Sequence, residues 1–413
     1  MPQRRVVVTG MGVLAPNGST IPQYWDGLQS GTSGIDFITY FDTSDYPVKI
    51  AGELAGFQPL DFFDRKESRK LDRFTMYGLV AAGEAIKNAE ILNAAAPERT
   101  GIIIGSGIGG IGTFEEQHRI MVEKGPRRIS PFFIPKMIAN IAAGHIAIRW
   151  GFKGPNHVVV SACASGTDAI GQAFRAIQHG DADVMITGGT EASVSPMAVA
   201  GFANMKALST SNDIPATASR PFDLNRNGFV IAEGAGMLVL EELDHALRRG
   251  ANILGEIGGY GATDDAFHVT QPAAGGAGAA VAMQMALTDA DMQPSEVDYI
   301  NAHGTSTPYN DKNESAAIRA VFGEDAYKLR VSSTKSMTGH SLGASGGLEA
   351  IAALLAIQHQ MIPPTINLET ADPECDLNYV PNSAIKASVN TVISNSLGFG
   401  GHNAVLLIKR WAD

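Results

Sequence analysis

The chain has 413 residues, of which 45% are hydrophobic and 18% are charged, and its formal net charge is −11. This length exceeds the usual size of one hydrophobic core, so we expect two packed units. The proportions of hydrophobic and charged residues exclude a disordered chain. The negative charge argues against bulk affinity for nucleic acid, although a local basic patch can still bind an acidic partner.

The first predicted element is a buried strand at residues 6–9. Two arginines precede this apolar run, as in a signal peptide, but Gly10 and Gly12 interrupt the run within a few residues. A strand is therefore the better interpretation. No apolar stretch approaches the roughly 20 residues that a membrane span requires, so we expect no membrane segment.

Short strand-like runs then alternate with amphipathic helical patterns. Further strands are predicted at residues 100–104, 157–160, 184–187, 236–240 and 404–408, and helices at residues 76–89 and 167–177. This alternation predicts an α/β fold in which helices cover sheets. The charge-rich segment 241–251 is the best candidate for a join, which predicts one unit at residues 1–250 and a second at residues 251–413.

Two segments in the first half suggest binding functions. Residues 64–73 form a helix-like stretch with five basic residues, which is either a solvated helix face or part of a docking surface. Residues 105–110 (Gly-Ser-Gly-Ile-Gly-Gly) fit the G-x-G-x-x-G spacing of dinucleotide sites. No second strand ending in an acidic residue follows about 20 positions on, so we expect close packing by these glycines and no nicotinamide cofactor.

Cys163 lies between a predicted strand and a predicted amphipathic helix, in a turn of small residues. A position at a helix N-terminus favours thiolate and would lower the pKa of the thiol from roughly 8.5. A structural cysteine is the alternative, but the strand–turn–helix context favours a nucleophile. Cys375 lies in a polar turn, where we expect no chemical role. With only two cysteines no disulfide framework is needed, and a reducing cytoplasm is the simplest location.

Two loops in the second half each place a histidine beside glycine. They are residues 299–308 with His303 and residues 333–347 with His340. Alone, each histidine is more often structural than catalytic. Neither loop has the close Cys/His spacing of a zinc site, so we expect no metal.

Taken as a set, several motifs resemble those of the β-ketoacyl-acyl-carrier-protein synthases. They are residues 8–12 (Val-Thr-Gly-Met-Gly), 162–166 (Ala-Cys-Ala-Ser-Gly), 219–223 (Ser-Arg-Pro-Phe-Asp), 301–307 (Asn-Ala-His-Gly-Thr-Ser-Thr), 335–340 (Lys-Ser-Met-Thr-Gly-His) and 398–403 (Gly-Phe-Gly-Gly-His-Asn). The resemblance covers nearly the whole chain and is strongest to the type II synthases, which elongate bacterial fatty acids. It implies a thiolase fold of two similar α/β halves, layered α-β-α-β-α, in a homodimer without a cofactor.

The resemblance also implies the chemistry. Cys163 would take an acyl chain from acyl carrier protein, and malonyl-carrier protein would lose carbon dioxide and attack the resulting thioester. His303 and His340 would stabilise the negative charge that develops during decarboxylation, and the sequence leaves open which of them does more. The backbone N–H groups of Cys163 and Phe399 would form the oxyanion hole. Lys335 with Glu349 would be either a structural ion pair or a direct participant in catalysis.

Further positions follow from the same resemblance. Thr305 and Thr307 would bind pantetheine, and Phe399 would act as a gate for the acyl substrate. The implied acyl-pocket residues are Ile108, Phe202 and Phe133, the last reaching across the dimer interface. The implied docking residues for acidic acyl carrier protein are Lys66, Arg69, Lys70, Arg127, Arg128 and Lys206. The sequence departs from the common pattern at two positions, because Leu397 stands where Phe is frequent and His402 where Thr is frequent.

Four related classes of protein are alternatives. A thiolase would need a second cysteine in the C-terminal glycine-rich loop, and residues 398–403 contain none. A priming synthase would replace one histidine with asparagine. A polyketide-type ketosynthase stays open, since the motifs separate it only weakly. A non-catalytic chain-length partner subunit would not need a nucleophile, so Cys163 argues against it.

Overall fold

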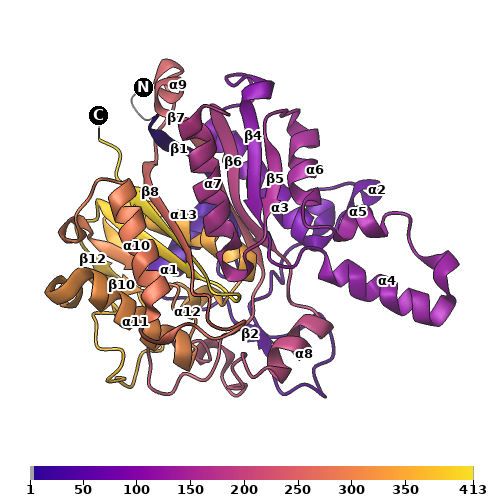
Figure 1. Cartoon of the computed structure of the whole chain (residues 1–413). Helices are drawn as coiled ribbons and strands as arrows, with labels where there is room; N and C mark the ends of the chain where they lie inside the picture. The colour runs from indigo at the N-terminus through magenta and orange to yellow at the C-terminus, as the bar shows by residue number, and fades with distance from the viewer. Residues whose placement is uncertain (1–3, 413) are drawn as a thin grey trace.

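A computed structural model describes residues 4–412. Figure 1 shows a layered α/β body from which helix α4 projects, with both ends of the chain at the same end of the molecule. The central sheet has ten strands in the order β10-β9-β13-β14-β8-β1-β7-β6-β4-β5. Its strands are β1 (Val6–Leu14), β4 (Thr100–Gly105), β5 (Asn156–Val159), β6 (Val184–Glu191), β7 (Gly234–Glu242), β8 (Gly255–Asp264), β9 (Tyr299–Asn301), β10 (Arg330–Ser332), β13 (Thr391–Leu397) and β14 (His402–Lys409).

Helices lie on both sides of the sheet and between its two halves. They are α1 (Ile21–Ser30), α2 (Arg65–Ser68), α3 (Arg73–Ala89), α4 (Ile111–Lys124), α5 (Phe133–Met137), α6 (Ile141–Trp150), α7 (Ser165–His179), α8 (Pro196–Asn204), α9 (Leu243–Arg248), α10 (Ala277–Asp289), α11 (Pro308–Phe322), α12 (Lys335–Thr338) and α13 (Ser345–His359). Two short ribbons complete the fold, β2 (Asp36–Phe37) with β3 (Ile50–Ala51), and β11 (Met361–Ile362) with β12 (Ile385–Lys386).

The ten strands are two copies of one five-stranded pattern. The orders β1-β7-β6-β4-β5 and β8-β14-β13-β9-β10 correspond strand by strand. In each copy the first two pairings are antiparallel and the last two are parallel. The copies meet where β1 pairs with β8 over three residues. The predicted α/β fold of two similar halves is confirmed, and the boundary at residues 250 and 251 stays a prediction.

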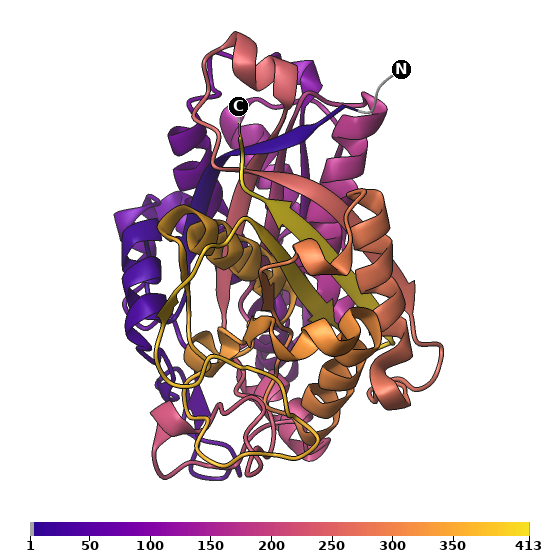
Figure 2. The same cartoon turned by 90° about the vertical axis from the view of Figure 1, so that its left-hand side faces the viewer.

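The layers follow from which helices cover which strands. α3 packs on β1, β7 and β6, and α10 packs on β8 and β14. α7 and α13 pack against each other and against strands of both halves, so they form the middle layer. Figure 2 shows the orange helices of residues 277–322 outside the yellow C-terminal strands. The order is therefore α-β-α-β-α, as predicted.

Apolar periodicity explains the two middle helices. The predicted stripe Ile170, Ala173, Phe174 and Ile177 on α7 is fully buried. Nearly all of α13 is buried, since the helix is apolar around its whole circumference and lies inside the protein. A 3₁₀ turn directly precedes each of these two helices, and the first residue of that turn, Ala162 or Leu342, has a positive φ.

Three predicted boundaries are wrong. The first strand continues through Gly10 and Gly12 to residue 14. These glycines do not end the strand but allow close packing, because a Cβ at either position would lie within 2.2 Å of a carbonyl oxygen of α3. The helix-like stretch at residues 64–73 contains only the one-turn helix α2, since Asp64 caps that helix and Asp72 caps the next. In segment 241–251 only α9 is helical, and residues 241 and 242 of this segment still belong to β7.

Candidate active site

Cys163 lies in the 3₁₀ turn between β5 and α7, and its side chain is buried. Ala162, just before it, has a φ of 50° in the left-handed region, which turns the chain sharply out of the sheet. Ser165 fixes this turn, because its hydroxyl donates to the carbonyl of Ala162 at 2.6 Å and accepts from the N–H of Ser161 at 3.0 Å. The predicted position at the start of a helix is confirmed.

The resting charge of this thiol differs from the prediction. Burial raises the pKa of Cys163 to about 11, although the N–H of Phe399, the Lys335 ammonium and its own N–H all act in the opposite direction. The expectation of a lowered pKa at the helix N-terminus is therefore wrong, because desolvation outweighs the amides. The side chain is therefore a thiol at neutral pH, and it would have to lose its proton in any reaction in which the sulfur is the nucleophile.

His303 and His340 come from different loops and meet beside Cys163. Their rings are 5.2 Å apart between centroids and nearly perpendicular, at 84°. Burial lowers the pKa of both rings well below its usual value, and the ammonium of Lys335 lowers both pKa values further. Both imidazoles are therefore neutral at physiological pH, and each can donate one N–H without adding a positive charge.

Hydrogen bonds hold each histidine in place. Glu314 on α11 accepts the main-chain N–H groups of His303 and Gly304, both at 2.8 Å. The main chain of His340 pairs with residues 230 and 232, and its Nδ1 lies 3.0 Å from Ser345 Oγ. The Nε2 of His340 and the Nδ1 of His303 are buried without a protein partner. Both nitrogens therefore have unused hydrogen-bonding capacity inside the protein.

Lys335 and Glu349 form a buried ion pair behind the histidines, which confirms the predicted partnership. Both side chains are almost completely inaccessible. Burial raises the pKa of Glu349 to about 7, against the lowering effect of Lys335. Neither residue lines the cavity beside Cys163, which favours a supporting role for the pair.

A cavity of about 270 Å³ lies in front of these groups. Its walls bring together most of the predicted substrate residues, which are Cys163, Phe202, Lys206, His303, Thr305, Thr307, His340 and Phe399, with the divergent Leu397. The predicted acyl-pocket residues Ile108 and Phe133 do not line it. Ile108 is 37% exposed in a neighbouring loop, and Phe133 packs near Phe114 on the projecting arm, where its ring centroid lies 6.3 Å from that of Phe114.

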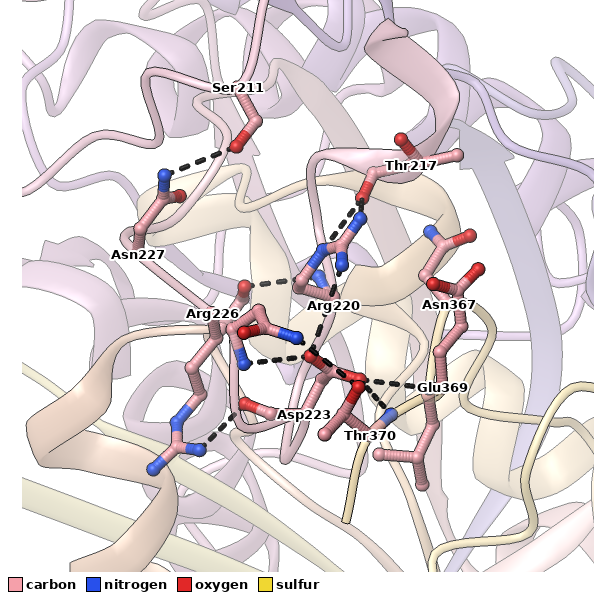
Figure 3. Close-up of polar contacts among 12 residues, drawn as sticks. Ser211, Thr217, Arg220, Asp223, Arg226, Asn227, Asn367, Glu369 and Thr370 are labelled. Atoms are coloured by element: carbon pink, nitrogen blue, oxygen red, sulfur yellow. Dashed lines mark hydrogen bonds and ion pairs between the residues drawn. The ribbon is translucent and has the colours of Figure 1, made fainter. Parts of the chain in front are cut away.

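A polar network beside the cavity holds the main chain of Thr307. Asp223 of the motif at residues 219–223 accepts the main-chain N–H groups of Glu369 and Thr370, at 2.8 and 2.7 Å (Figure 3). Arg226, close by, donates to the carbonyls of Thr307 and Pro308 and pairs with two buried aspartates. Asp223 and Arg226 therefore support loops beside the cavity, and neither side chain lines it.

The six predicted docking residues are all exposed but do not form one patch. Three belong to the α2 region, two lie beyond the end of the projecting α4, and Lys206 is at the cavity mouth (Figure 1).

The sequence also concealed supporting residues. Glu314, Ser345 and Glu191 are completely or almost completely buried and hold the segments of His303, His340 and residues 106–109. Glu314 lies on the buried face of α11. An acidic residue at an apolar position of a helix was the sequence feature that could have identified it as a supporting residue. Among residues 4–412 no cluster of three or more His, Cys, Asp or Glu side chains is arranged to hold a metal ion. No helix in the described part of the chain is long and apolar enough to cross a membrane.

Comparison with known proteins shows the family. The beta-ketoacyl synthase N-terminal domain matches residues 3–246, and the C-terminal domain of the same family matches residues 254–369. The chain belongs to the β-ketoacyl synthase family. It is thus an acyltransferase of the condensing type, which confirms the resemblance described above.

Relatives and solved structures agree with this assignment. The chain is 54% identical to a 3-oxoacyl-[acyl-carrier-protein] synthase 2 from Staphylococcus aureus over 99% of both chains. It is 52% identical to one from Synechocystis, again over 99% of both. Among solved structures, a β-ketoacyl synthase from Burkholderia phymatum has a TM-score of 0.92 at 36% identity, covering 99% of this chain and 100% of that one. The ishigamide ketosynthase/chain length factor reaches a TM-score of 0.93 at 37% identity with the same coverage.

Proposed function

We propose that this β-ketoacyl synthase elongates fatty acyl chains carried on acyl carrier protein, with Cys163 as the acyl acceptor. The observation that carries the proposal is a buried thiol facing two neutral imidazoles with unpartnered nitrogens in one cavity. The names of the full-length relatives support the substrate, and a solved ketosynthase in complex with its acyl-carrier protein supports the partner. That structure has a TM-score of 0.92 at 35% identity over 99% of this chain and 100% of that one.

The first half-reaction would acylate Cys163. The sulfur attacks the carbonyl carbon of the carrier-bound thioester, a new C–S bond forms, and the carrier thiol leaves with the proton. The N–H groups of Cys163 and Phe399, which act on the sulfur, would stabilise the oxyanion. Phe399 and Phe202 have ring centroids 6.4 Å apart, so the proposed gate can contact the proposed acyl wall.

The second half-reaction would form the new carbon–carbon bond. The bond between the malonyl α-carbon and its carboxylate breaks, carbon dioxide leaves, and the electron pair passes to an enolate. N–H groups of His303 and His340 would stabilise the enolate oxygen, and neutral donors suit this task because they do not trap the anion as a tight ion pair. The α-carbon then attacks the Cys163 thioester, and the thiolate leaves. Lys335 would keep both rings neutral, and Glu349 would hold Lys335 in place.

The acidic carrier would be guided by the exposed basic residues named above. Lys206 at the mouth is the best placed of these residues, and the two threonines behind it would bind pantetheine. The three basic residues near α2 and the two beyond α4 would extend this surface. Reversing the charge of Lys206 should raise KM for the carrier substrate and leave kcat nearly unchanged.

We further propose a homodimer in the cytoplasm. β5 is at the end of the ten-stranded sheet, and Val160, which follows it, is 60% exposed. Exposed apolar residues also gather on the projecting arm, namely Phe114, Met121, Val122, Phe132 and Ile134. A second copy would cover these surfaces and bring Phe133 to the partner's acyl pocket. Light scattering on a dilution series tests the dimer, and both cysteines are free thiols, as a reducing compartment requires.

The decisive experiment measures acylation alone. The protein is incubated with hexadecanoyl-carrier protein without malonyl donor, and intact mass is recorded for wild type, Cys163→Ala and the matched control Cys375→Ala. Cys375 is equally buried but belongs to a different apolar cluster. One adduct that is lost only in Cys163→Ala supports the proposal. No adduct in wild type would overturn it and return weight to a non-catalytic partner subunit.

A polyketide-type ketosynthase is the second candidate, because two of the solved relatives have polyketide-type titles or a chain length factor. Their identity of 35 and 37% is lower than the 52 to 54% of the elongating relatives. Repeated condensation without reduction of the β-keto group would favour this candidate.

A further inference from the structure

Asp168, on the first turn of α7, joins two hydroxyl groups from different parts of the fold. One of its carboxylate oxygens accepts from the hydroxyl of Ser161, and the other accepts from the hydroxyl of Tyr260 at 2.6 Å. Ser161 lies between β5 and the turn of Cys163, whereas Tyr260 lies on β8 in the second half of the protein. Asp168 and Ser161 are buried, so these hydrogen bonds replace contacts with water.

Tyr260 is itself held in place by three elements. Its ring lies directly on α7, since a Cβ on Gly171 would be 2.3 to 2.5 Å from three atoms of this ring. Its main-chain N–H donates to Asp289 on α10 at 2.9 Å, and Arg175 of α7 pairs with the same aspartate at 2.8 Å. The Tyr260 hydroxyl therefore has a fixed position, from which it orients Asp168.

The turn that begins at Ser161 contacts the loop of Phe399. A Cβ on Gly398 would lie 2.9 Å from the carbonyl oxygen of Ser161, 3.2 Å from the nitrogen of Cys163 and 3.3 Å from that of Ala164. So close an approach of two main chains requires glycine. The N–H groups of Cys163 and Phe399 form the proposed oxyanion hole, so the spacing of these donors depends on the position of the turn.

The second half of the protein provides an internal comparison, because the turn before α13 repeats the 3₁₀ geometry of the turn before α7. Ser341 and Leu348 stand there at the positions that correspond to Ser161 and Asp168. Ser341 donates to the carbonyl of Glu233, and Leu348 belongs to the apolar core. Of these two turns, only the one that carries the cysteine is held by a carboxylate.

We propose that Asp168 is a positioning residue that holds the acyl-accepting turn and so aligns the two N–H donors of the oxyanion hole. The inference rests on the proposed function, since it requires an acyl thioester on Cys163 whose carbonyl oxygen accepts from these donors. Asp168 does not line the cavity, so it acts through Ser161 and not on the substrate. Loss of the carboxylate frees the Ser161 hydroxyl, lets the turn move away from Gly398 and weakens the hydrogen bonds to the carbonyl oxygen.

Two substitutions of Asp168 separate geometry from charge. Asp168→Ala removes both hydrogen bonds. Asp168→Asn removes the negative charge and keeps both bonds, because a hydroxyl can donate to the amide oxygen or accept from the amide N–H groups. A positioning role predicts a loss in the alanine variant and rescue in the asparagine variant. An electrostatic effect of the carboxylate on the thiol predicts the same loss in both.

Tyr260→Phe is a milder change, and Tyr379→Phe is its matched control. The first variant removes the hydroxyl that orients Asp168 and keeps the ring on α7. The second also removes a tyrosine hydroxyl that is hydrogen-bonded to another side chain, since the Tyr379 hydroxyl lies 2.7 Å from Ser315 Oγ. Tyr379 belongs to a different apolar cluster from Cys163. The control therefore reports the general effect of losing such a hydroxyl.

The experiment uses the full chain and measures single-turnover acylation of Cys163 by hexadecanoyl-carrier protein. The maximal rate and the half-saturating carrier concentration are obtained separately. We expect Asp168→Ala to lower the maximal rate about tenfold and to change the half-saturating concentration less than about twofold. Asp168→Asn and Tyr379→Phe should stay within about twofold of wild type in both quantities, and Tyr260→Phe should lower the maximal rate about threefold.

A second readout observes the thioester directly. With an isotope-labelled acyl carbonyl, infrared difference spectra of the acylated protein give the carbonyl stretch, which rises in wavenumber as hydrogen bonds to its oxygen weaken. We expect this band to rise in Asp168→Ala and, by less, in Tyr260→Phe. It should keep its wild-type position in Asp168→Asn and Tyr379→Phe. A general loss of stability would not move the band.

The outcomes separate this inference from the function on which it rests. A wild-type maximal rate with an unmoved band in Asp168→Ala overturns the positioning role, and so does an equal loss in Asp168→Ala and Asp168→Asn. Where Asp168→Ala does not fold, Tyr260→Phe decides, because a band that matches Tyr379→Phe overturns the inference and a raised band supports it. Failure of wild type to accept the acyl chain refutes the proposed function.

Discussion

The two middle helices approach each other through glycines, and this contact gives a quantitative prediction. Gly346, the second residue of α13, lies so close to α7 that a Cβ there would be 2.2 Å from Thr167 Oγ1 and 2.3 Å from Thr167 N. Real Cβ atoms are not found below 3.0 Å from such neighbours. Because the main chain of Thr167 cannot rotate away, Gly346→Ala must separate the starts of the two helices.

The size of the effect follows from two opposing contributions. Replacing glycine by alanine in a helix favours folding by up to about 1 kcal/mol, and overpacking a core costs about 1–3 kcal/mol. Gly112→Ala is the matched control, since Gly112 is the second residue of α4 and has nothing within 4 Å of its Cβ position. The intrinsic helix contribution is the same in both variants, so the difference in unfolding free energy isolates the clash.

We expect Gly346→Ala to be less stable than Gly112→Ala by about 1–3 kcal/mol, measured as urea midpoints at equal protein concentration. Condensation should also fall more than overall stability predicts, since Cys163 lies just before α7 and His340 just before α13. Equal stability of the two variants, with turnover at the wild-type rate, would refute the interpretation of a rigid contact between α7 and α13.

Three further predictions follow from the buried charges. Lys335→Met removes a cation that lowers the pKa of His303 and His340, so the acid limb of malonyl decarboxylation should move to higher pH if these rings act as proposed. An unmoved limb in the pH profile would contradict this electrostatic role. Arg226→Met leaves two buried carboxylates unpaired and should lower stability by about 3–5 kcal/mol near neutral pH. Burial already raises the pKa of one of these carboxyls, Asp311, to about 6, which is above its value in the unfolded chain. Protonation of Asp311 therefore favours the folded state, so the stability lost in Arg226→Met should shrink as the pH falls through and below about 6. Urea midpoints at two pH values check this. Finally, the rate of Cys163 alkylation by iodoacetamide should still rise above pH 9, and a plateau near pH 7 would mean that the surrounding amides outweigh burial.

The sequence predicts the fold well where side-chain patterns control it. The stripe on α7 and the apolar runs of β4 and β6 identified those elements, because burial on one or both faces leaves a regular pattern. β8 escaped prediction because four glycines weaken its strand signal. Two of these, Gly259 and Gly261, are required by contact with α10, whose carbonyl oxygens would lie within 2.2 Å of a Cβ. That requirement is tertiary and leaves no local signature.

The candidate site was predicted in its reacting groups and missed in its supports. Cys163, His303 and His340 stood in recognisable motifs, and the structure brings them to one cavity. Glu191 and Glu314 act through main-chain N–H groups of distant segments, and such contacts depend on the fold and not on neighbours in sequence. The prediction of a lowered pKa for Cys163 was wrong for the same reason, because the position at a helix start can be read from the local sequence and burial cannot.

The repeated five-stranded pattern has a consequence for how this enzyme can change. The turn before α7 and the turn before α13 correspond, and in both the first residue has positive φ, Ala162 at 50° and Leu342 at 46°. The counterpart of Cys163 in the second half is thus Gly343. Duplication of one ancestral unit within a single gene would explain this correspondence. In that case one copy retained a cysteine at the turn, and the other copy has glycine there and supplies the two histidines. Cys163 lies in the first half and both histidines lie in the second, so a separated half would hold only part of the candidate site.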